Sequence, residues 1–124
     1  MGRRTPPVRV RYAGGGGGAE QILPGCAVYL VARGRIADQI MHDEYVEKAL
    51  PTIPASARVV CFDLASEVVE GDPADSRTVI IEFPSRDEFR AWYDSPAYRE
   101  VLPLRLESVP GNMVVVEGFV PPAE

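Results

Sequence analysis

Residues 78–105 read TVIIEFPSRDEFRAWYDSPAYREVLPLR, and this stretch decides how the chain folds. Its first six residues are mostly β-branched or aromatic, which predicts a packed β-strand. Pro84 ends that strand, because proline has no N–H to donate to a neighbouring strand. Ser85 followed by Glu88 is the pattern of a capping box, in which each residue satisfies an N–H at the start of a helix. A buried strand therefore runs directly into a capped helix.

The helix that starts here carries an aromatic stripe. Phe89, Trp92 and Tyr93 fall at positions i, i+3 and i+4, which lie on one face of a helix. Ser95 followed by Pro96 repeats the start signal, with serine at the N-cap and proline at the first helical position. A second helix therefore follows at once and fades near residue 107.

The remaining elements follow from the same signals. Asp38 is expected to cap a helix that ends near Leu50, before Pro51. Residues 110–112, Pro-Gly-Asn, turn the chain into a last strand. The predicted strands lie at residues 26–36, 58–63, 78–83 and 113–117, and a bulge in the second strand with a continuation through residues 67–69 is left open. The order βαββαβ, with one extra helical segment, predicts an α+β fold with a mainly antiparallel four-stranded sheet.

The chain of 124 residues has the size of one domain, which we place at residues 25–120 before a short tail at 121–124. Residues 1–24 are rich in glycine, proline and arginine, so we expect a flexible leader. The formal net charge of −5 argues against nucleic acid or an anionic membrane as the main partner. No apolar run approaches the roughly 20 residues of a membrane span. Cys26 and Cys61 lie in apolar runs and are expected to be buried, reduced thiols in a cytoplasmic protein.

Two apolar triplets predict a partner. Residues 79–81 and 114–116 are apolar at successive positions, which is expected where both faces of a sheet are covered. The helices of a βαββαβ unit cover one face, and the chain has no further amphipathic helix for the other. A second copy, packed sheet against sheet, is the simplest cover, so we expect a homodimer.

Four segments of the chain resemble the DUF1330 family, a domain of unknown function: EFPS at residues 82–85, AWYDSPAY at 91–98, VVEGD at 68–72 and VVVEG at 114–118. The resemblance extends from about residue 26 to residue 120. It implies a ferredoxin-like, dimeric α+β barrel in which the helices lie on one face and the sheets of two copies form the barrel. It also implies a cavity beside each sheet, against the partner sheet or against the subunit's own helices.

The resemblance leaves three classes of function open. The superfamily includes monooxygenases, isomerases, cyclases and lyases that need no cofactor or metal. The first class is accordingly a cofactor-independent acid–base enzyme for an apolar, oxygen-bearing metabolite of the kind found in secondary metabolism. The second is a dimeric binding or stress-associated module without turnover. The third is a structural dimer whose cavity is filled by its own side chains.

Strand alternation sorts the polar candidates. Val28, Leu30 and Ala32 share one face of the first strand, so Arg33 is expected on the other. Its charge then lies in an apolar barrel lining with Asp63 and Glu82, unless these side chains reach solvent or pair at the strand ends. The set expected on this second face is Tyr29, Arg33, Cys61, Asp63, Thr78, Glu82, Met113 and Glu117.

His42 is the only histidine and the first candidate for acid–base chemistry, because its unperturbed pKa of about 6.5 suits neutral pH. The alternative is an imidazole on the helix surface beside Asp43. Trp92 and Tyr98 have core packing as their alternative role. The predicted catalytic residues are His42, Asp63, Glu82 and Tyr45. The predicted substrate-binding residues are Tyr29, Arg33, Trp92, Tyr98 and Arg105, the last as a fork-shaped donor to an anion.

Overall fold

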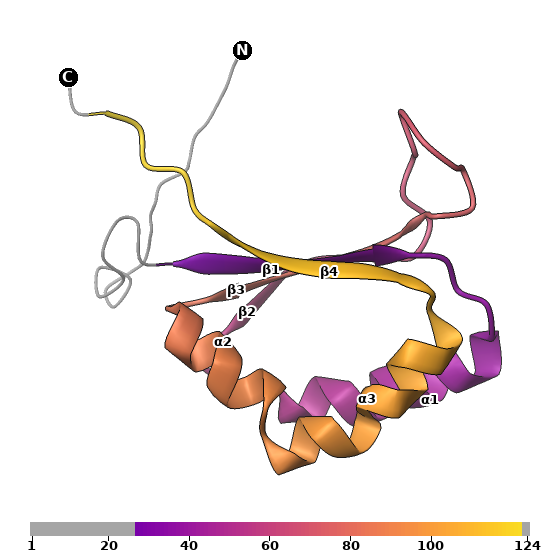
Figure 1. Cartoon of the computed structure of the whole chain (residues 1–124), viewed down its shortest axis with the longest axis horizontal. Helices are drawn as coiled ribbons and strands as arrows, with labels where there is room; N and C mark the ends of the chain where they lie inside the picture. The colour runs from indigo at the N-terminus through magenta and orange to yellow at the C-terminus, as the bar shows by residue number, and fades with distance from the viewer. Residues whose placement is uncertain (1–26, 123–124) are drawn as a thin grey trace.

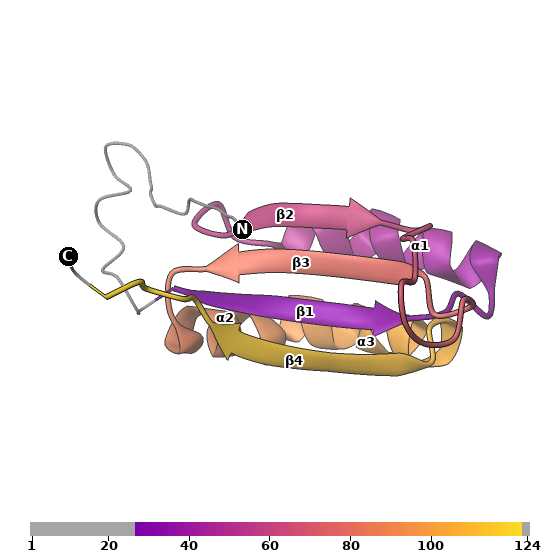
Figure 2. The same ribbon diagram turned by 90° about the horizontal axis from the view of Figure 1, so that it is seen from above.

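The computed structural model describes residues 27–122, so the predicted leader at 1–24 and Cys26 lie outside the described part of the chain. The sheet has four antiparallel strands in the order β2-β3-β1-β4. All the helices lie against one face of it (Figure 1), and Figure 2 shows the strands side by side from the uncovered face. This confirms the predicted α+β fold. The elements are β1 (Val28–Gly34), α1 (Gln39–Ala49), η3 (Leu50–Thr52), β2 (Arg58–Asp63), β3 (Arg77–Phe83), α2 (Arg86–Tyr93), α3 (Pro96–Ser108) and β4 (Gly111–Glu117).

The predicted helix starts are confirmed by three side-chain caps. The Asp38 carboxylate accepts a hydrogen bond from the Met41 amide at 3.0 Å. The Ser85 and Ser95 hydroxyls accept from the amides three residues on, each at 3.2 Å. Each cap satisfies one of the N–H groups that a helix leaves unpaired at its start. The caps therefore set where α1, α2 and α3 begin.

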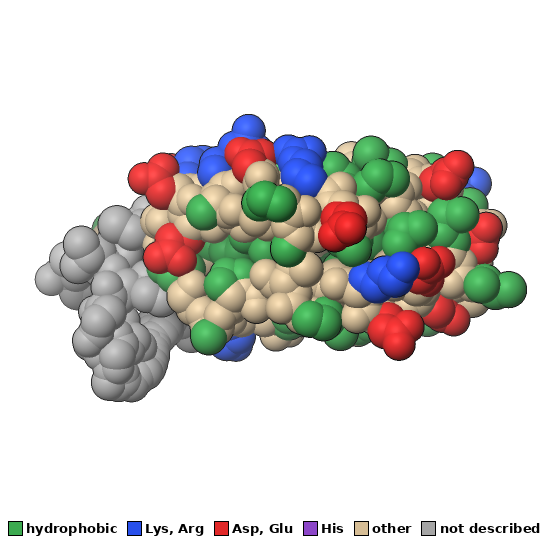
Figure 3. All heavy atoms as spheres, turned by 90° about the horizontal axis from the view of Figure 1, so that it is seen from below, with side chains coloured by type: hydrophobic (Ala, Val, Ile, Leu, Met, Phe, Trp, Pro, Cys, Tyr) green, Lys and Arg blue, Asp and Glu red, His purple; other side chains and the backbone are tan. Residues whose placement is uncertain are grey.

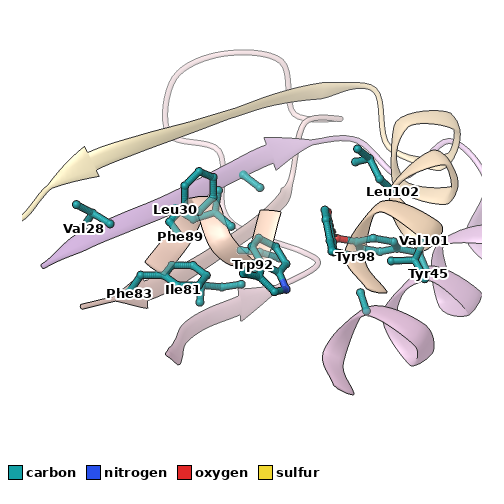
Figure 4. Close-up of a cluster of buried hydrophobic side chains, with 13 residues drawn as sticks. Val28, Leu30, Tyr45, Ile81, Phe83, Phe89, Trp92, Tyr98, Val101 and Leu102 are labelled. Carbon is teal, nitrogen blue, oxygen red and sulfur yellow. Dashed lines mark hydrogen bonds between the residues drawn. The ribbon is translucent and has the colours of Figure 1, made fainter. Parts of the chain in front are cut away.

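An aromatic cluster fills the space between α2 and the sheet. The rings of Phe83 and Phe89 meet edge to face with centroids 5.5 Å apart. Trp92 packs on Tyr98 with centroids 4.2 Å apart. Figure 4 shows the Tyr98 ring between Trp92 and Tyr45, so the cluster continues from α2 to the α1–α3 pair. These large buried surfaces hold the helices on the sheet.

The uncovered face of the sheet is apolar at its centre. Val31, Ile80 and Val114 lie across β1, β3 and β4 in register, on the face away from the helices. Val114 is 50% exposed and Val116 is 43% exposed. The free thiol of Cys61 lies opposite Ile80 and is half-buried rather than buried. The β2–β3 loop rises above this face at one end of the strands (Figure 1).

The face of the sheet on which each side chain lies was predicted correctly for three strands and wrongly for β4. Tyr29, Arg33, Cys61, Asp63, Thr78 and Glu82 share the uncovered face, as expected. Met113 and Glu117 instead share the helix side, because they pair with Ala32 and Val28 of β1. Residues 114–116 are apolar on both faces, so their pattern does not fix the phase of the strand. The predicted second strand ends at Asp63, without the continuation through residues 67–69.

Candidate functional site

The predicted site residues fall on opposite sides of the sheet. On the uncovered face, the Glu82 carboxylate accepts a hydrogen bond from the Tyr29 hydroxyl at 3.1 Å and another from Arg58 Nε at 3.1 Å. Arg33 donates to the Asp75 carbonyl at 2.6 Å. The Asp63 carboxylate accepts from the Ala65 amide at 2.9 Å and so closes a turn. These groups are tied to separate partners and do not converge on one point.

Three of the other predicted residues lie around a pocket between the sheet and the helices. Tyr45, Trp92 and Arg105 line it, and its volume is about 40 Å³. Its walls are otherwise almost wholly apolar. The sheet contributes Leu30, Ala32, Val79, Ile81, Val59 and Phe62, and η3 contributes Leu50 at the edge. An apolar pocket with a few converging polar groups is the usual form of a small-molecule site.

A hydrogen-bond chain leads from α3 to this pocket. Arg105 Nε donates to the Tyr98 hydroxyl at 3.2 Å, and the hydroxyls of Tyr98 and Tyr45 lie 2.8 Å apart. A guanidinium can only donate, so the Tyr98 oxygen accepts and its own proton is available to Tyr45. Burial, with the Tyr98 hydroxyl adding to it, raises the pKa of Tyr45 well above its ordinary value. Tyr45 is therefore a neutral phenol at neutral pH.

His42 lies behind the pocket, not on the helix surface. Its side chain is 0% exposed, and Arg77 Nε donates to His42 Nε2 at 2.8 Å. That bond requires a lone pair on Nε2, so the proton of the neutral ring is on Nδ1. Nδ1 is buried without a hydrogen-bond partner among the described residues. Burial first, and then the Arg77 charge, lower the pKa of His42, with Asp43 opposing them. The ring is a neutral acceptor that orients Arg77.

Arg77 is the residue that the sequence analysis missed. It is 3% exposed, lines the pocket, and is the first residue of β3. The sequence contained a signal for its burial. Arg77 lies an even number of positions from Val79, Ile81 and Phe83, which all face the helices. The predicted strand began one residue later, and so left this arginine in the preceding loop. Alternation extended by one position would have placed a charge in the core.

Arg77 and Arg105 are both buried cations, the second 8% exposed. Neither forms an ion pair within residues 27–122, where every arginine–carboxylate pair involves other residues. Burial lowers the pKa of Arg77, and the Arg105 charge acts in the same direction. Buried charges are normally paired, because removing an ion from water costs several kcal/mol. This pair of guanidiniums is the unusual feature of the site.

Trp92 forms a wall of the pocket and is fixed by its own hydrogen bond. Its indole Nε1 donates to the Thr52 hydroxyl at 2.9 Å, which ties α2 to η3. The indole donor is therefore already used. Within residues 27–122, no group of three or more His, Cys, Asp and Glu side chains is arranged to hold a metal ion. The described helices also include none that is long and apolar enough to cross a membrane.

The sequence profile described as domain of unknown function (DUF1330) matches residues 27–119. The chain belongs to the DUF1330 family. No curated protein matches this member of the family. A solved structure of a protein of unknown function from Rhodopseudomonas palustris is 18% identical, with a TM-score of 0.65 over 78% of this chain and 85% of that one.

Two enzymes have the same fold as this DUF1330 protein. The hydroxynitrile lyase of Passiflora edulis is 17% identical, with a TM-score of 0.58 over 82% of this chain and 99% of the lyase. SnoaB of Streptomyces nogalater, a cofactor-independent oxygenase, is 12% identical, with a TM-score of 0.55 over 80% of this chain and 99% of SnoaB. The chain thus has the dimeric α+β barrel fold, whose members include cofactor-independent oxygenases and a lyase. At these identities the likeness extends to the fold alone.

Proposed function

We propose that this DUF1330 protein is a homodimer that binds an apolar, oxygen-bearing metabolite between its sheet and its helices. There it catalyses a cofactor-independent proton transfer next to a carbonyl group. The observation that carries the proposal is the polarity of the pocket. Tyr45, Arg77 and Arg105 are its hydrogen-bonding side chains with donors left to offer, and the rest of the wall is largely apolar.

A site made of donors stabilises negative charge on oxygen. When a proton leaves the carbon next to a carbonyl, the electron pair moves to the carbonyl oxygen and forms an enolate. Arg77 and Arg105 would hold that oxygen, Tyr45 would donate a hydrogen bond to it, and water would accept the proton that leaves the carbon. Removing one such donor typically costs about 10²–10³ in kcat, because the charge develops in a site with little water. His42 would act by positioning Arg77, while its predicted acid–base role and those of Asp63 and Glu82 remain predictions.

The size of the pocket implies that its edge moves on binding. A dry cavity of about 150 Å³ is what benzene fills, and this pocket measures about 40 Å³. Leu50 and Phe62 line the pocket and are 48% and 43% exposed, so they can turn outward without unpacking the core. Figure 3 shows the helix-covered side, where hydrophobic side chains lie in a shallow hollow among charged ones.

One observation favours a second candidate, a binding module without turnover. The pocket wall contains no carboxylate, and the His42 lone pair is taken by Arg77. Within the described residues, the pocket therefore offers no side-chain base, and water would have to accept the proton. A ligand could then bind in the pocket without reacting.

The two candidates are separated by one experiment on the full chain. Aryl ketones are incubated with the protein in D2O, and proton loss next to the carbonyl is followed by NMR. We expect faster exchange than in buffer, with Arg105→Met lowering the rate about 10²–10³-fold. Arg86→Met, a surface change of the same kind on α2, should leave the rate unchanged. Binding without exchange would support the module, and neither binding nor exchange for any ketone would refute both candidates.

A further inference from the structure

No carboxylate within residues 27–122 forms an ion pair with either of the two buried arginines of the pocket. Arg77 and Arg105 each use one N–H in a hydrogen bond to a neutral group, the His42 ring and the Tyr98 hydroxyl. An arginine has five N–H donors, so four remain on each side chain. Tyr45 does not provide the charge, because its raised pKa keeps it protonated. The missing negative charge must therefore come from outside the described protein.

The number of donors indicates a carboxylate. A carbonyl oxygen accepts about two hydrogen bonds, whereas a carboxylate has about four acceptor positions arranged to match guanidinium groups. Arg77 and Arg105 with the Tyr45 hydroxyl offer more donors than one carbonyl can use. A substrate that carries a carboxylate beside its reacting carbonyl would occupy them and would neutralise buried charge.

The pocket also changes character from its inner end to its mouth. Arg77 and Arg105 at the inner end are only 3% and 8% exposed. Leu50, Val59 and Phe62 line the same pocket and are 48%, 40% and 43% exposed, so they form the mouth, between η3 and the edge strand β2. The charged end is thus buried, and the solvent end is hydrophobic. A ligand that fits this gradient has an anionic head and an apolar tail.

We propose that the ligand of this pocket is an amphipathic carboxylic acid that enters head-first. Its carboxylate binds Arg77, Arg105 and Tyr45, and its apolar tail lies along Leu50, Val59 and Phe62. The inference rests on the proposed function, because it assigns the substrate class of the same pocket. It adds that the ligand is already an anion when it binds.

The test uses three small probes with the full chain, in a buffer free of carboxylate and phosphate. Octanoate has both the head and the tail, octanamide has the tail with a neutral head, and acetate has the head alone. Binding is measured by isothermal titration calorimetry and by the shift in Tm. We expect octanoate to bind at least about tenfold more tightly than either other probe, because only octanoate satisfies both ends of the pocket.

Two variants locate the binding. Arg105→Met should lower octanoate affinity at least about tenfold while leaving the Tm of the free protein equal or higher, because it removes an uncompensated buried charge. Phe62→Ser, at a half-exposed position, should lower the affinity for octanoate and leave the affinity for acetate unchanged. Arg86→Met is the matched control and should change neither. If Arg105→Met does not fold, Phe62→Ser still decides the question.

Several results would overturn the inference. Equal affinity for octanoate and octanamide would show that the head need not be charged. Equal affinity for octanoate and acetate would show an anion site without selection for a tail. Octanoate binding that neither Arg105→Met nor Phe62→Ser reduces would place it elsewhere. Ketone binding in this pocket without octanoate binding would refute this inference and leave the proposed function standing, so the two failures are distinct.

Discussion

At the scale of single residues, the hydrogen bond between His42 and Arg77 fixes the tautomer of the imidazole and orients the guanidinium. The guanidinium needs an acceptor for Nε in an apolar environment, and the imidazole supplies one only while Nε2 is unprotonated. Protonation of the ring would put two cations face to face, with Asp43 as the nearby opposing charge. The pair is therefore a neutral acceptor bound to a buried cation, and protonation of His42 would break it.

This pair predicts a stability change near neutral pH. The pKa of His42 is lowered from about 6.5 in the folded chain, so the unfolded chain binds more protons as the pH falls through that value. Stability should therefore fall between pH 7.5 and pH 5.5, above the range where carboxylates titrate. Because the chain has one histidine, His42→Gln should abolish the slope. Urea denaturation at several pH values measures this, and an unchanged slope in His42→Gln would contradict it.

A second variant separates the acceptor from the charge. His42→Gln keeps an oxygen that can accept from Arg77 Nε. His42→Phe leaves that N–H buried and unsatisfied, at a cost of about 1–3 kcal/mol. We therefore expect His42→Phe to be less stable than His42→Gln at pH 7.5, by urea denaturation. Equal stability would mean that Arg77 finds another acceptor.

The same residues show what a sequence can and cannot predict at this scale. Tyr45, Trp92, Tyr98 and Arg105 were named as candidates from residue type and periodicity, and Tyr45, Trp92 and Arg105 line the pocket. The burial of His42 could not be predicted, because its helix neighbours Asp43 and Glu44 are charged and its partner Arg77 is 35 positions away. Long-range pairing, not local pattern, removes His42 from solvent.

At the scale of elements, the start of α2 differs in one respect from the predicted capping box. The Ser85 hydroxyl accepts from the Glu88 amide, as predicted. The Glu88 carboxylate, however, accepts from the Ser56 hydroxyl at 2.9 Å. The box is thus half formed, and its second half is replaced by a link to the segment before β2.

This geometry predicts that Ser85 contributes more to the stability of the fold than Glu88 does. Ser85→Ala should destabilise the fold by about 1 kcal/mol, because a helix N–H loses its acceptor. Glu88→Gln should change stability by less than about 0.5 kcal/mol, since its contact with Ser56 is exposed and an amide oxygen can replace it. Chemical denaturation of both variants gives the comparison. A loss for Glu88→Gln as large as that for Ser85→Ala would contradict this expectation.

Element boundaries were more predictable than strand phase for a physical reason. A cap depends on residues three positions apart, so Asp38, Ser85 and Ser95 could be recognised locally. The phase of β4 depends on its pairing with β1, which residues 114–116 leave undecided because they are apolar on both faces. The two wrong placements, Met113 and Glu117, both come from this strand.

At the scale of the whole molecule, the sheet separates two surfaces for which we propose different roles. Leu30 and Ala32 of β1 face the pocket, and Val31 between them faces away from the helices. Val31, Ile80 and Val114 form an apolar centre on that second face, with Arg33, Asp63 and Glu82 around it. A second copy of this surface would supply both apolar cover and opposite charges, which supports the proposed homodimer.

The last prediction tests that homodimer. Light scattering at about 10 µM should give twice the chain mass of 13.5 kDa. Val114→Asp places a carboxylate at the centre of the face, and two-fold symmetry would bury it twice, so the dissociation constant of the dimer should rise at least about 100-fold. Ile40→Asp adds the same charge on α1, at an 83% exposed position on the helix side, and should leave the dimer intact. A wild-type mass of 13.5 kDa, or equal effects of both substitutions in sedimentation analysis, would show that this face does not hold two copies together.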